Sequence, residues 1–199
     1  IKTKQGCKEL INQATNIGIV SGIFNLAVNL HDAQFEDQTI DSFEKSLAPK
    51  AIATKYLDEL SQILCPNLRY FVIFSSISCG RGNASQSNYG MSNSIMERII
   101  EKRHRQGLPA KAIQWGAIGV VGILANLLEK NVNLNIGGTL PQTISSCLDV
   151  IDALVTSDEP IVSSIIVAKN QFGDGKKGNF IETMLNILGI SDKKSLSMD

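Results

Sequence analysis

RYFVIFSSISCGRGNASQSNYGMSNSIMERII, residues 69–100, is the stretch that decides the fold class of this chain. Its first part, 69–77, is an apolar run whose Phe, Val and Ile residues alternate only weakly with polar ones, which is typical of a strand covered on both faces of a parallel sheet. A polar strip follows, and from residue 88 to residue 107 apolar side chains recur at helical spacing. The stretch therefore predicts a buried strand, a polar turn and a helix, in that order.

The same alternation of helix and strand extends over the rest of the chain. Further apolar runs rich in Val, Ile and Phe cover residues 18–28, 111–121 and 161–168. Further helical patterns cover residues 5–16, 41–64 and 140–157, the last with Pro141 in its first turn. Basic residues end the pattern at 88–107, so EKRHRQ (101–106) is expected to be a solvated helix end with Gly107 as its C-cap. This order predicts an α/β fold with a Rossmann-like, doubly wound parallel sheet.

The composition limits the classes of function. The chain has 199 residues, 43% of them hydrophobic, and its 19 basic and 19 acidic residues give a formal net charge of zero. That balance argues against a nucleic-acid or polybasic membrane partner, and no apolar run reaches the roughly 18 residues of a membrane span. The cysteines form no CxxC pair and have no His at ligand spacing, so we expect reduced thiols and no metal in a cytoplasmic protein. They are Cys7, Cys65, Cys79 and Cys147.

The composition changes after residue 168. Residues 169–179 are rich in Gly and Lys and are expected to form a linker. Residues 180–199 open on FIETMLNILGI, whose apolar residues share one helical face, and they predict the first helix of another unit. Because the chain begins with Ile and stops within a polar segment, we expect a piece of a longer polypeptide.

Polar or specialised side chains stand where three of the expected strands end. These residues are Asn25, Ser75, Ser76, Trp115 and Gly116. In open parallel sheets, ligands bind beyond the carboxyl ends of the strands, so these side chains are expected to share one edge. Tyr89 and Asn93 are four residues apart at the head of the following helix and therefore lie on one face of it.

Tyr89 carries a hydroxyl that could act as a proton donor. A tyrosine has a pKa of about 10, and a nearby ammonium would lower that value by favouring the phenolate. Lys50 lies within the helical pattern between the first two strands and is flanked by small apolar residues in APKAIAT. The alternatives are an ordinary structural tyrosine and an ordinary solvated lysine.

The spacing of these residues resembles that of the short-chain dehydrogenase/reductases. Twelve residues separate Ser76 from Tyr89, and Asn93 stands where most of that superfamily has a lysine, while Lys50 lies upstream. This exchanged arrangement is similar to the ketoreductase domains of multifunctional fatty acid and polyketide synthases. GIFNLAV, LAPKAIAT, GLPAKAIQWGAIG and the opening stretch resemble in particular the ketoreductase of an animal-type fatty acid synthase, over about residues 8–168. The tail, 180–199, resembles the start of the acyl-carrier domain.

The resemblance implies a role for each catalytic residue. Tyr89 would be the proton donor and Ser76 the hydroxyl that binds the substrate carbonyl. Lys50 would be the cation that lowers the pKa of Tyr89, and Asn93 would hold the lysine and a water. The implied reaction is hydride transfer from NADPH to the ketone of a 3-oxoacyl group carried by an acyl-carrier protein. The product would be a 3-hydroxyacyl thioester.

The resemblance also implies which residues contact the cofactor. Asn25, Leu26 and Ala27 would lie against its ribose, and Trp115 and Gly116 beside its nicotinamide. The glycine-rich dinucleotide loop and the first strands of the fold are missing, because neither GAIGVVG nor GRGN fits the motif. We therefore expect an uncovered sheet edge, and weak NADPH binding by these residues alone.

Several points stay open beside the fatty acid synthase interpretation. The chain could belong to the ketoreductase of an animal polyketide synthase, to a non-catalytic structural subdomain, or to a truncated product without function. The complete set of Lys50, Ser76, Tyr89 and Asn93 argues against the structural subdomain.

Residues 1–168 are assigned to the reductase, and residues 123–138 are expected to form a lid over the substrate. The parent protein is expected to be a homodimer in which other synthase domains are partners.

Overall fold

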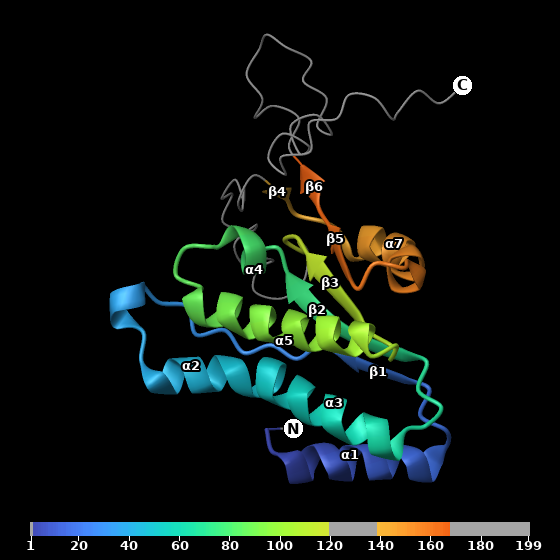
Figure 1. The fold of residues 1–199 in the computed structure, drawn as a ribbon. Coiled ribbons are helices and arrows are strands. Elements are labelled where there is room, and N and C mark those ends of the chain that lie inside the picture. The colour runs from blue at the N-terminus through green and yellow to red at the C-terminus, as the bar shows by residue number, and fades with distance from the viewer. Residues whose placement is uncertain (1, 120–138, 168–199) are drawn as a thin grey trace, which may run out of the picture. The chain divides into compact units, whose positions relative to one another are not determined.

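The computed structural model describes residues 2–119 and 139–167, all within the first of the two units into which the chain divides, Ile1–Val167 (Figure 1). The expected lid at 123–138, the linker at 169–179 and the segment 180–199 lie outside the described residues.

A parallel sheet forms the centre of the described part, in the strand order β1-β2-β3-β5 (Figure 1). Its strands are β1 (Gly22–Asn25), β2 (Tyr70–Ser76), β3 (Lys111–Trp115) and β5 (Ile161–Ser164). Beyond it, β4 (Thr139–Leu140) and β6 (Ile166–Val167) pair antiparallel. The helices are α1 (Lys4–Ile17), α2 (Ile40–Leu47), α3 (Ala53–Leu64), α4 (Ser78–Arg81), α5 (Ser87–Arg105) and α7 (Ile144–Thr156), with a 3-10 turn at Phe35–Asp37. The predicted α/β fold with a parallel sheet is confirmed.

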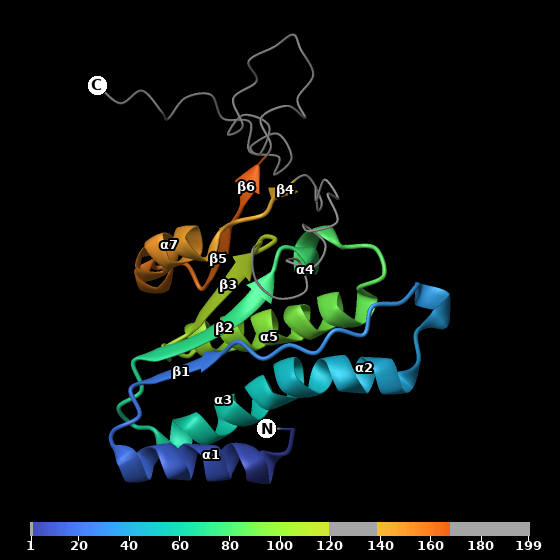
Figure 2. The same ribbon diagram turned by 180° about the vertical axis from the view of Figure 1, so that it is seen from behind.

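Helices cover the sheet on both faces, as the weakly alternating strands predict (Figure 2). On one face, Phe71 and Ile73 of β2 pack with buried residues of α1, α3 and α5. On the other face, Val72 of β2 packs with Ile113 of β3 and with α7. Successive residues of β2 therefore serve opposite cores, which explains why that strand has no polar face.

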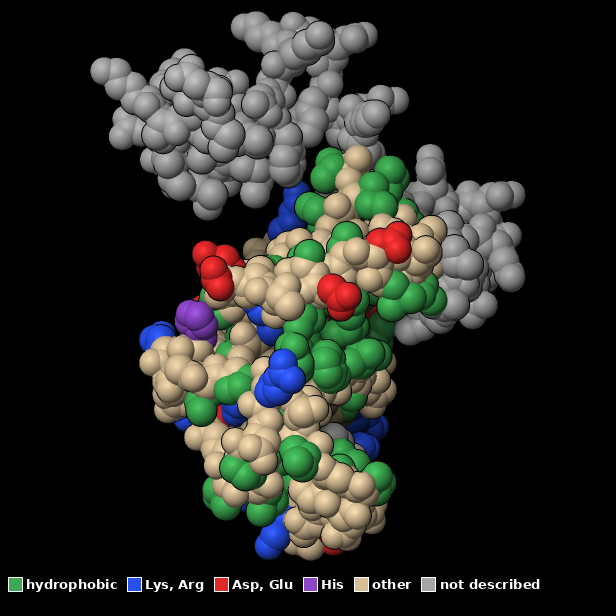
Figure 3. All heavy atoms as spheres, turned by 90° about the vertical axis from the view of Figure 1, so that its right-hand side faces the viewer, with side chains coloured by type: hydrophobic (Ala, Val, Ile, Leu, Met, Phe, Trp, Pro, Cys, Tyr) green, Lys and Arg blue, Asp and Glu red, His purple; other side chains and the backbone are tan. Residues whose placement is uncertain are grey.

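The sheet stays partly open beside α7. Among the described strands β1 pairs only with β2, so one edge of β1 has no partner there, as expected. Phe24 of β1 is 50% exposed. Figure 3, which views the molecule from the side of α7, shows apolar side chains gathered in a patch.

Several predicted boundaries are too wide. The strand expected at 18–28 is β1 alone, because the Asn25 side chain accepts a hydrogen bond from Ala27 N (3.0 Å) and turns the chain. The helix expected at 140–157 begins at Ile144 rather than at Pro141, because Thr143 caps it. The run 111–121 ends as a strand at residue 115, and the run 161–168 divides into β5 and β6.

The helix expected at 41–64 is interrupted by a π-helical turn, Ala48–Ile52, between α2 and α3. Pro49 lies in this turn, and it has no N–H to donate to the carbonyl of Lys45. The amide of Asn29 takes its place and donates to Lys45 O (3.4 Å). The backbone passes the missing Pro49 hydrogen bond through a wider, π-helical turn. Turns of this kind are frequent at functional sites.

Arg103 corrects the expectation that residues 101–106 are a solvated helix end. Its side chain is only 1% exposed, and Nη1 donates to Asp58 Oδ1 of α3 at 2.6 Å. Its Nε donates to Pro109 O (2.9 Å), and the guanidinium lies 4.0 Å from the ring centroid of Phe71. The C-cap is Gln106 rather than the expected Gly107, which follows it with a positive φ of 69°.

Candidate active site

The carboxyl ends of β1, β2 and β3 open into one pocket of about 320 Å³. Most of the predicted site residues line it: Leu26, Lys50, Ser76, Tyr89, Trp115 and Gly116. Val28, Leu30, Phe74, Ser75, Gln86 and Ile118 complete the lining. Side chains that are up to 92 residues apart in the sequence thus share one cavity, because parallel strands end at the same edge.

Lys50 reaches the pocket from the π-turn and is buried, with 2% of its surface exposed. Its Nζ donates to Phe74 O at 3.0 Å and lies 5.3 Å from the ring centroid of Tyr89. Burial lowers the pKa of Lys50 from 10.5 to about 8. The lysine is therefore not an ordinary solvated one.

Ser76 ends β2 with a hydroxyl that can donate its own proton. Its Oγ accepts hydrogen bonds from Ser78 N (3.2 Å) and Ser78 Oγ (3.0 Å). Since both of these bonds use lone pairs of Ser76, its own O–H remains a donor, and its partner is the Tyr89 hydroxyl. Ser78, in the first turn of α4, therefore orients a predicted catalytic hydroxyl, although no sequence pattern marked it.

Tyr89 is half-buried in the first turn of α5. Burial raises the pKa of its hydroxyl above the usual 10, and the side chains of Asn93 and Ser76 offset part of that rise. The expected lowering of this pKa by Lys50 is therefore not what the structure has: the ammonium lies over the ring face and donates to Phe74. The phenol keeps its proton at neutral pH, as a proton donor must.

Asn93 lies one turn along α5 from Tyr89 and is fully buried. Its Nδ2 donates to Tyr89 O at 3.1 Å, while its Oδ1 has no partner among the described residues. Trp115 Nε1 likewise has no partner in the described part of the chain. Buried polar atoms without partners cost free energy, so a water or a ligand group is expected at each of them.

Asn25 and Ala27 do not line the pocket, and the amide of Asn25 has a supporting part instead. Its Nδ2 donates to Thr54 Oγ1 (2.9 Å) and to Pro49 O (3.3 Å), while Oδ1 accepts from Ala27 N. One buried side chain thus joins the end of β1 to the π-turn that carries Lys50.

The pocket fits one end of a nicotinamide cofactor. Leu26 and Val28 are 55% and 54% exposed at its rim, where a flat ring could lie, and the unpaired Trp115 Nε1 could bind a polar group. Gly116 packs closely, since a Cβ there would lie 3.3 Å from Ile165 Cγ2. The described residues contain no glycine-rich loop for a pyrophosphate, so they fit the reactive end only.

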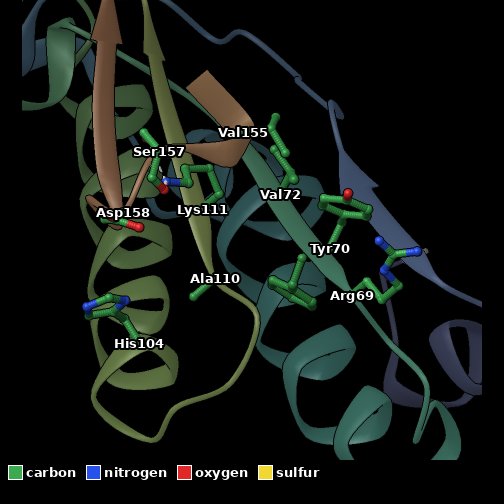
Figure 4. Close-up of a pocket in the computed structure, with 10 residues that line it drawn as sticks. Arg69, Tyr70, Val72, His104, Ala110, Lys111, Val155, Ser157 and Asp158 are labelled. Atoms are coloured by element: carbon green, nitrogen blue, oxygen red, sulfur yellow. Dashed lines mark hydrogen bonds between the residues drawn. The ribbon is translucent and has the colours of Figure 1, made fainter. Parts of the chain in front are cut away.

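A second pocket, of about 220 Å³, lies at the opposite ends of β2 and β3 (Figure 4). Lys111 is its buried cation, but its Nζ donates to Ser157 O (2.6 Å), Ser157 Oγ (3.0 Å) and Glu159 O. All three ammonium protons are therefore used to hold the turn that follows α7. We assign this pocket to structure rather than to chemistry.

Sequence reasoning also missed Gln86, which lines the active-site pocket. Its Nε2 donates to Asp32 Oδ2 at 2.8 Å and so joins the loop after β1 to the segment before α5. Its position inside the polar strip was the one available signal.

Within residues 2–119 and 139–167, no three potential ligands gather at a metal site, and no helix has the length and apolar character needed to cross a membrane.

Comparisons with known proteins agree with this architecture. A family model described as "KR domain" matches residues 1–119. The chain is 29% identical to the highly reducing polyketide synthase GPY1 of Gibberella fujikuroi over 176 residues, which are 87% of the chain and 6% of that protein. An A1-type ketoreductase structure is similar at a TM-score of 0.75 and 22% identity, covering 84% of this chain and 35% of that one.

A structure of a short-chain dehydrogenase from Burkholderia cenocepacia J2315 in complex with NADP is also similar. The TM-score is 0.65 at 13% identity, and the match covers 83% of this chain and 72% of that one. At these identities the likeness shows the fold, which is the α/β fold of the short-chain dehydrogenase/reductase type.

Proposed function

The chain belongs to the KR domain family, and from this premise we propose that it carries the catalytic side chains of a ketoreductase. The reaction is the NADPH-dependent reduction of a 3-oxoacyl thioester to a 3-hydroxyacyl thioester. The observation that carries the proposal is the single pocket in which Lys50, Ser76 and Tyr89 meet at the strand ends.

Each side chain has a defined part in the proposed reaction. A bound nicotinamide cofactor would supply the hydride. Ser76 donates its O–H to the ketone oxygen and holds the carbonyl over Tyr89. Tyr89 gives its phenolic proton to the same oxygen, which becomes the product hydroxyl. Lys50 and a water held by Asn93 Oδ1 return a proton to Tyr89.

The cofactor would lie along the apolar rim of the pocket. Leu26 and Lys50 would hold its ribose side, and Trp115 and Gly116 its nicotinamide side. The NADP bound to the similar short-chain dehydrogenase supports this choice of cofactor. The binding site for the pyrophosphate would be supplied by a further segment of the synthase that pairs with the edge of β1 that has no partner among the described strands.

The substrate belongs to a fatty acid or a polyketide synthase. The sequence resembles an animal-type fatty acid synthase, whereas the curated relatives named in the comparisons are polyketide synthases and hybrid synthetases. In both settings the 3-oxoacyl group is carried by an acyl-carrier domain, whose start we assign to residues 180–199, after the linker at 169–179. The other domains of a cytoplasmic, homodimeric synthase would be the partners.

The decisive test compares Tyr89→Phe with the unchanged protein, in the synthase polypeptide that carries this chain. NADPH loss is followed with an acetoacetyl thioester, and with the 2-methyl-branched thioester to separate the two kinds of synthase. We expect the rate to fall by about 10²- to 10⁴-fold without the phenolic proton. Tyr56→Phe on α3, which does not line the pocket, is the matched control.

Two results would contradict the proposal. Full activity in Tyr89→Phe would remove the tyrosine from the reaction. A folded, NADPH-binding wild-type protein that reduces neither thioester would favour the non-catalytic structural subdomain.

A further inference from the structure

Glu97 is a buried carboxylate for which the proposed reaction has no use. It lies on α5, eight residues after Tyr89, and is 3% exposed. Its Oε1 accepts hydrogen bonds from Ser75 Oγ and from Gln114 Nε2 (2.9 Å), and its Oε2 accepts one from Cys79 Sγ (3.2 Å). These donors come from β2, β3 and α4, so one carboxylate joins three separate elements to α5.

The two donors on strands each precede a residue that lines the active-site pocket. Ser75 precedes Ser76, and Gln114 precedes Trp115, and the two pairs are in register between β2 and β3. Successive side chains of a strand point to opposite faces. Holding Ser75 and Gln114 on the α5 side therefore sets the direction in which Ser76 and Trp115 leave the sheet.

The third donor acts on Ser76 through α4. Cys79 follows Ser78, which donates two hydrogen bonds to Ser76. Burial raises the pKa of Cys79 to about 11, so the thiol keeps its proton and remains a donor. Glu97 therefore acts on Ser76 from two sides, through Ser75 and through α4.

Burying a carboxylate is an unfavourable way merely to fill a core. No ion pair to Glu97 is present in the part of the chain that the structure describes. Its three partners are neutral, and a buried carboxylate without a cation is tolerated only when hydrogen bonds satisfy it. An apolar residue would pack there at lower cost, so the contacts themselves are the reason for this residue.

We propose that Glu97 is a positioning residue, which fixes the strand ends on which Ser76 and Trp115 stand. This inference rests on the proposed ketoreductase function. It predicts that Glu97→Leu lowers kcat by about 10- to 100-fold, the range typical of residues that orient catalytic groups. KM should change by less than about threefold, because the lost contacts act on the transition state.

Glu97→Gln is the conservative variant that separates positioning from bulk packing. Its amide oxygen can still accept from both Ser75 and Gln114, and only the bond from Cys79 is lost, so kcat should stay within about threefold of wild type. Ser75→Ala removes one donor and should lower kcat in the same direction by a smaller factor. This variant keeps the proposal testable if Glu97→Leu does not fold.

A spectroscopic measurement on the 199-residue chain gives an answer that does not depend on activity. Trp115 is the single tryptophan of the chain, so its fluorescence emission reports on the pocket alone. Glu97→Leu should shift that emission, and Glu97→Gln should leave it unchanged. Asp58→Asn removes another buried carboxylate, on α3, and serves as the control for lost stability without a shift.

The outcomes are distinguishable. A folded Glu97→Leu protein with wild-type kcat and emission would overturn the inference, as would a Glu97→Gln protein impaired as strongly as Glu97→Leu. If the wild-type synthase reduces neither thioester, the proposed function fails. The Trp115 emission then still decides whether Glu97 holds the strand ends.

Discussion

Replacement of Arg103 by methionine tests how the helix that carries the catalytic tyrosine is held. Arg103 is 1% exposed and Asp58 is 4% exposed, and their ion pair at 2.6 Å joins α5 to α3. Methionine keeps the apolar contact with Phe71 but leaves the carboxylate of Asp58 buried without a cation. Breaking a buried pair in this way costs about 3–5 kcal/mol of unfolding free energy.

Urea unfolding of the chain, followed by Trp115 fluorescence, measures this loss. With a urea dependence of about 2 kcal/mol per M, the midpoint should fall by about 1.5–2.5 M. Arg98→Met is the matched control, because that arginine is on the same helix and 66% exposed, and among the described residues its ion pair is to Glu101. Its midpoint should move by less than about 0.5 M. Equal shifts in the two variants would refute the assignment of Arg103 as a buried anchor.

Three further predictions concern the site and the helix end. The pKa of Lys50 is about 8 in the folded chain and 10.5 in its ordinary state, so between these values the unfolded chain keeps a proton that the folded chain has lost. The unfolding free energy of wild type should therefore rise by about 2 kcal/mol relative to that of Lys50→Met from about pH 8 to pH 10. A flat difference between the two urea curves would contradict its burial. Ser78→Ala should lower kcat about tenfold with little change in KM, because Ser76 loses an orienting bond; an unchanged kcat would exclude that role. Gly107→Ala should lower the unfolding free energy by about 1 kcal/mol, because alanine is strained at the positive φ of residue 107. Gly80→Ala, where a Cβ on α4 meets open space, is the control and should not lower it. Equal urea midpoints for the two variants would contradict backbone strain at residue 107.

The elements that the sequence predicts well are those whose pattern reports their own burial. β2 and α5 were expected at 69–77 and 88–107 and are found at Tyr70–Ser76 and Ser87–Arg105. A strand covered on both faces needs a continuous apolar run, and a helix on one face needs apolar residues at its own period. The gathering of polar residues at one edge follows as well, because parallel strands end together.

The placements that depend on contacts between elements could not be read in this way. Arg103 belongs to a basic run that is typical of a solvated helix end, and only the approach of Asp58 on α3 makes its burial favourable. β1 is shorter than its apolar run, because ladder pairing with β2 and the turn at Asn25 decide where a strand ends. Glu97 has no local pattern that distinguishes it from a surface glutamate.

The sequence by itself thus determined the α/β class, the order of the elements and the spacing of Ser76 and Tyr89, because these depend on local periodicity and on position along the chain. The tertiary structure decided which lysine reaches the tyrosine and what holds the strand ends. Lys50 reaches the pocket only because a π-turn at Pro49 and the amide of Asn25 set its direction. Such placement depends on hydrogen bonds between residues far apart in the chain, and no local pattern encodes them.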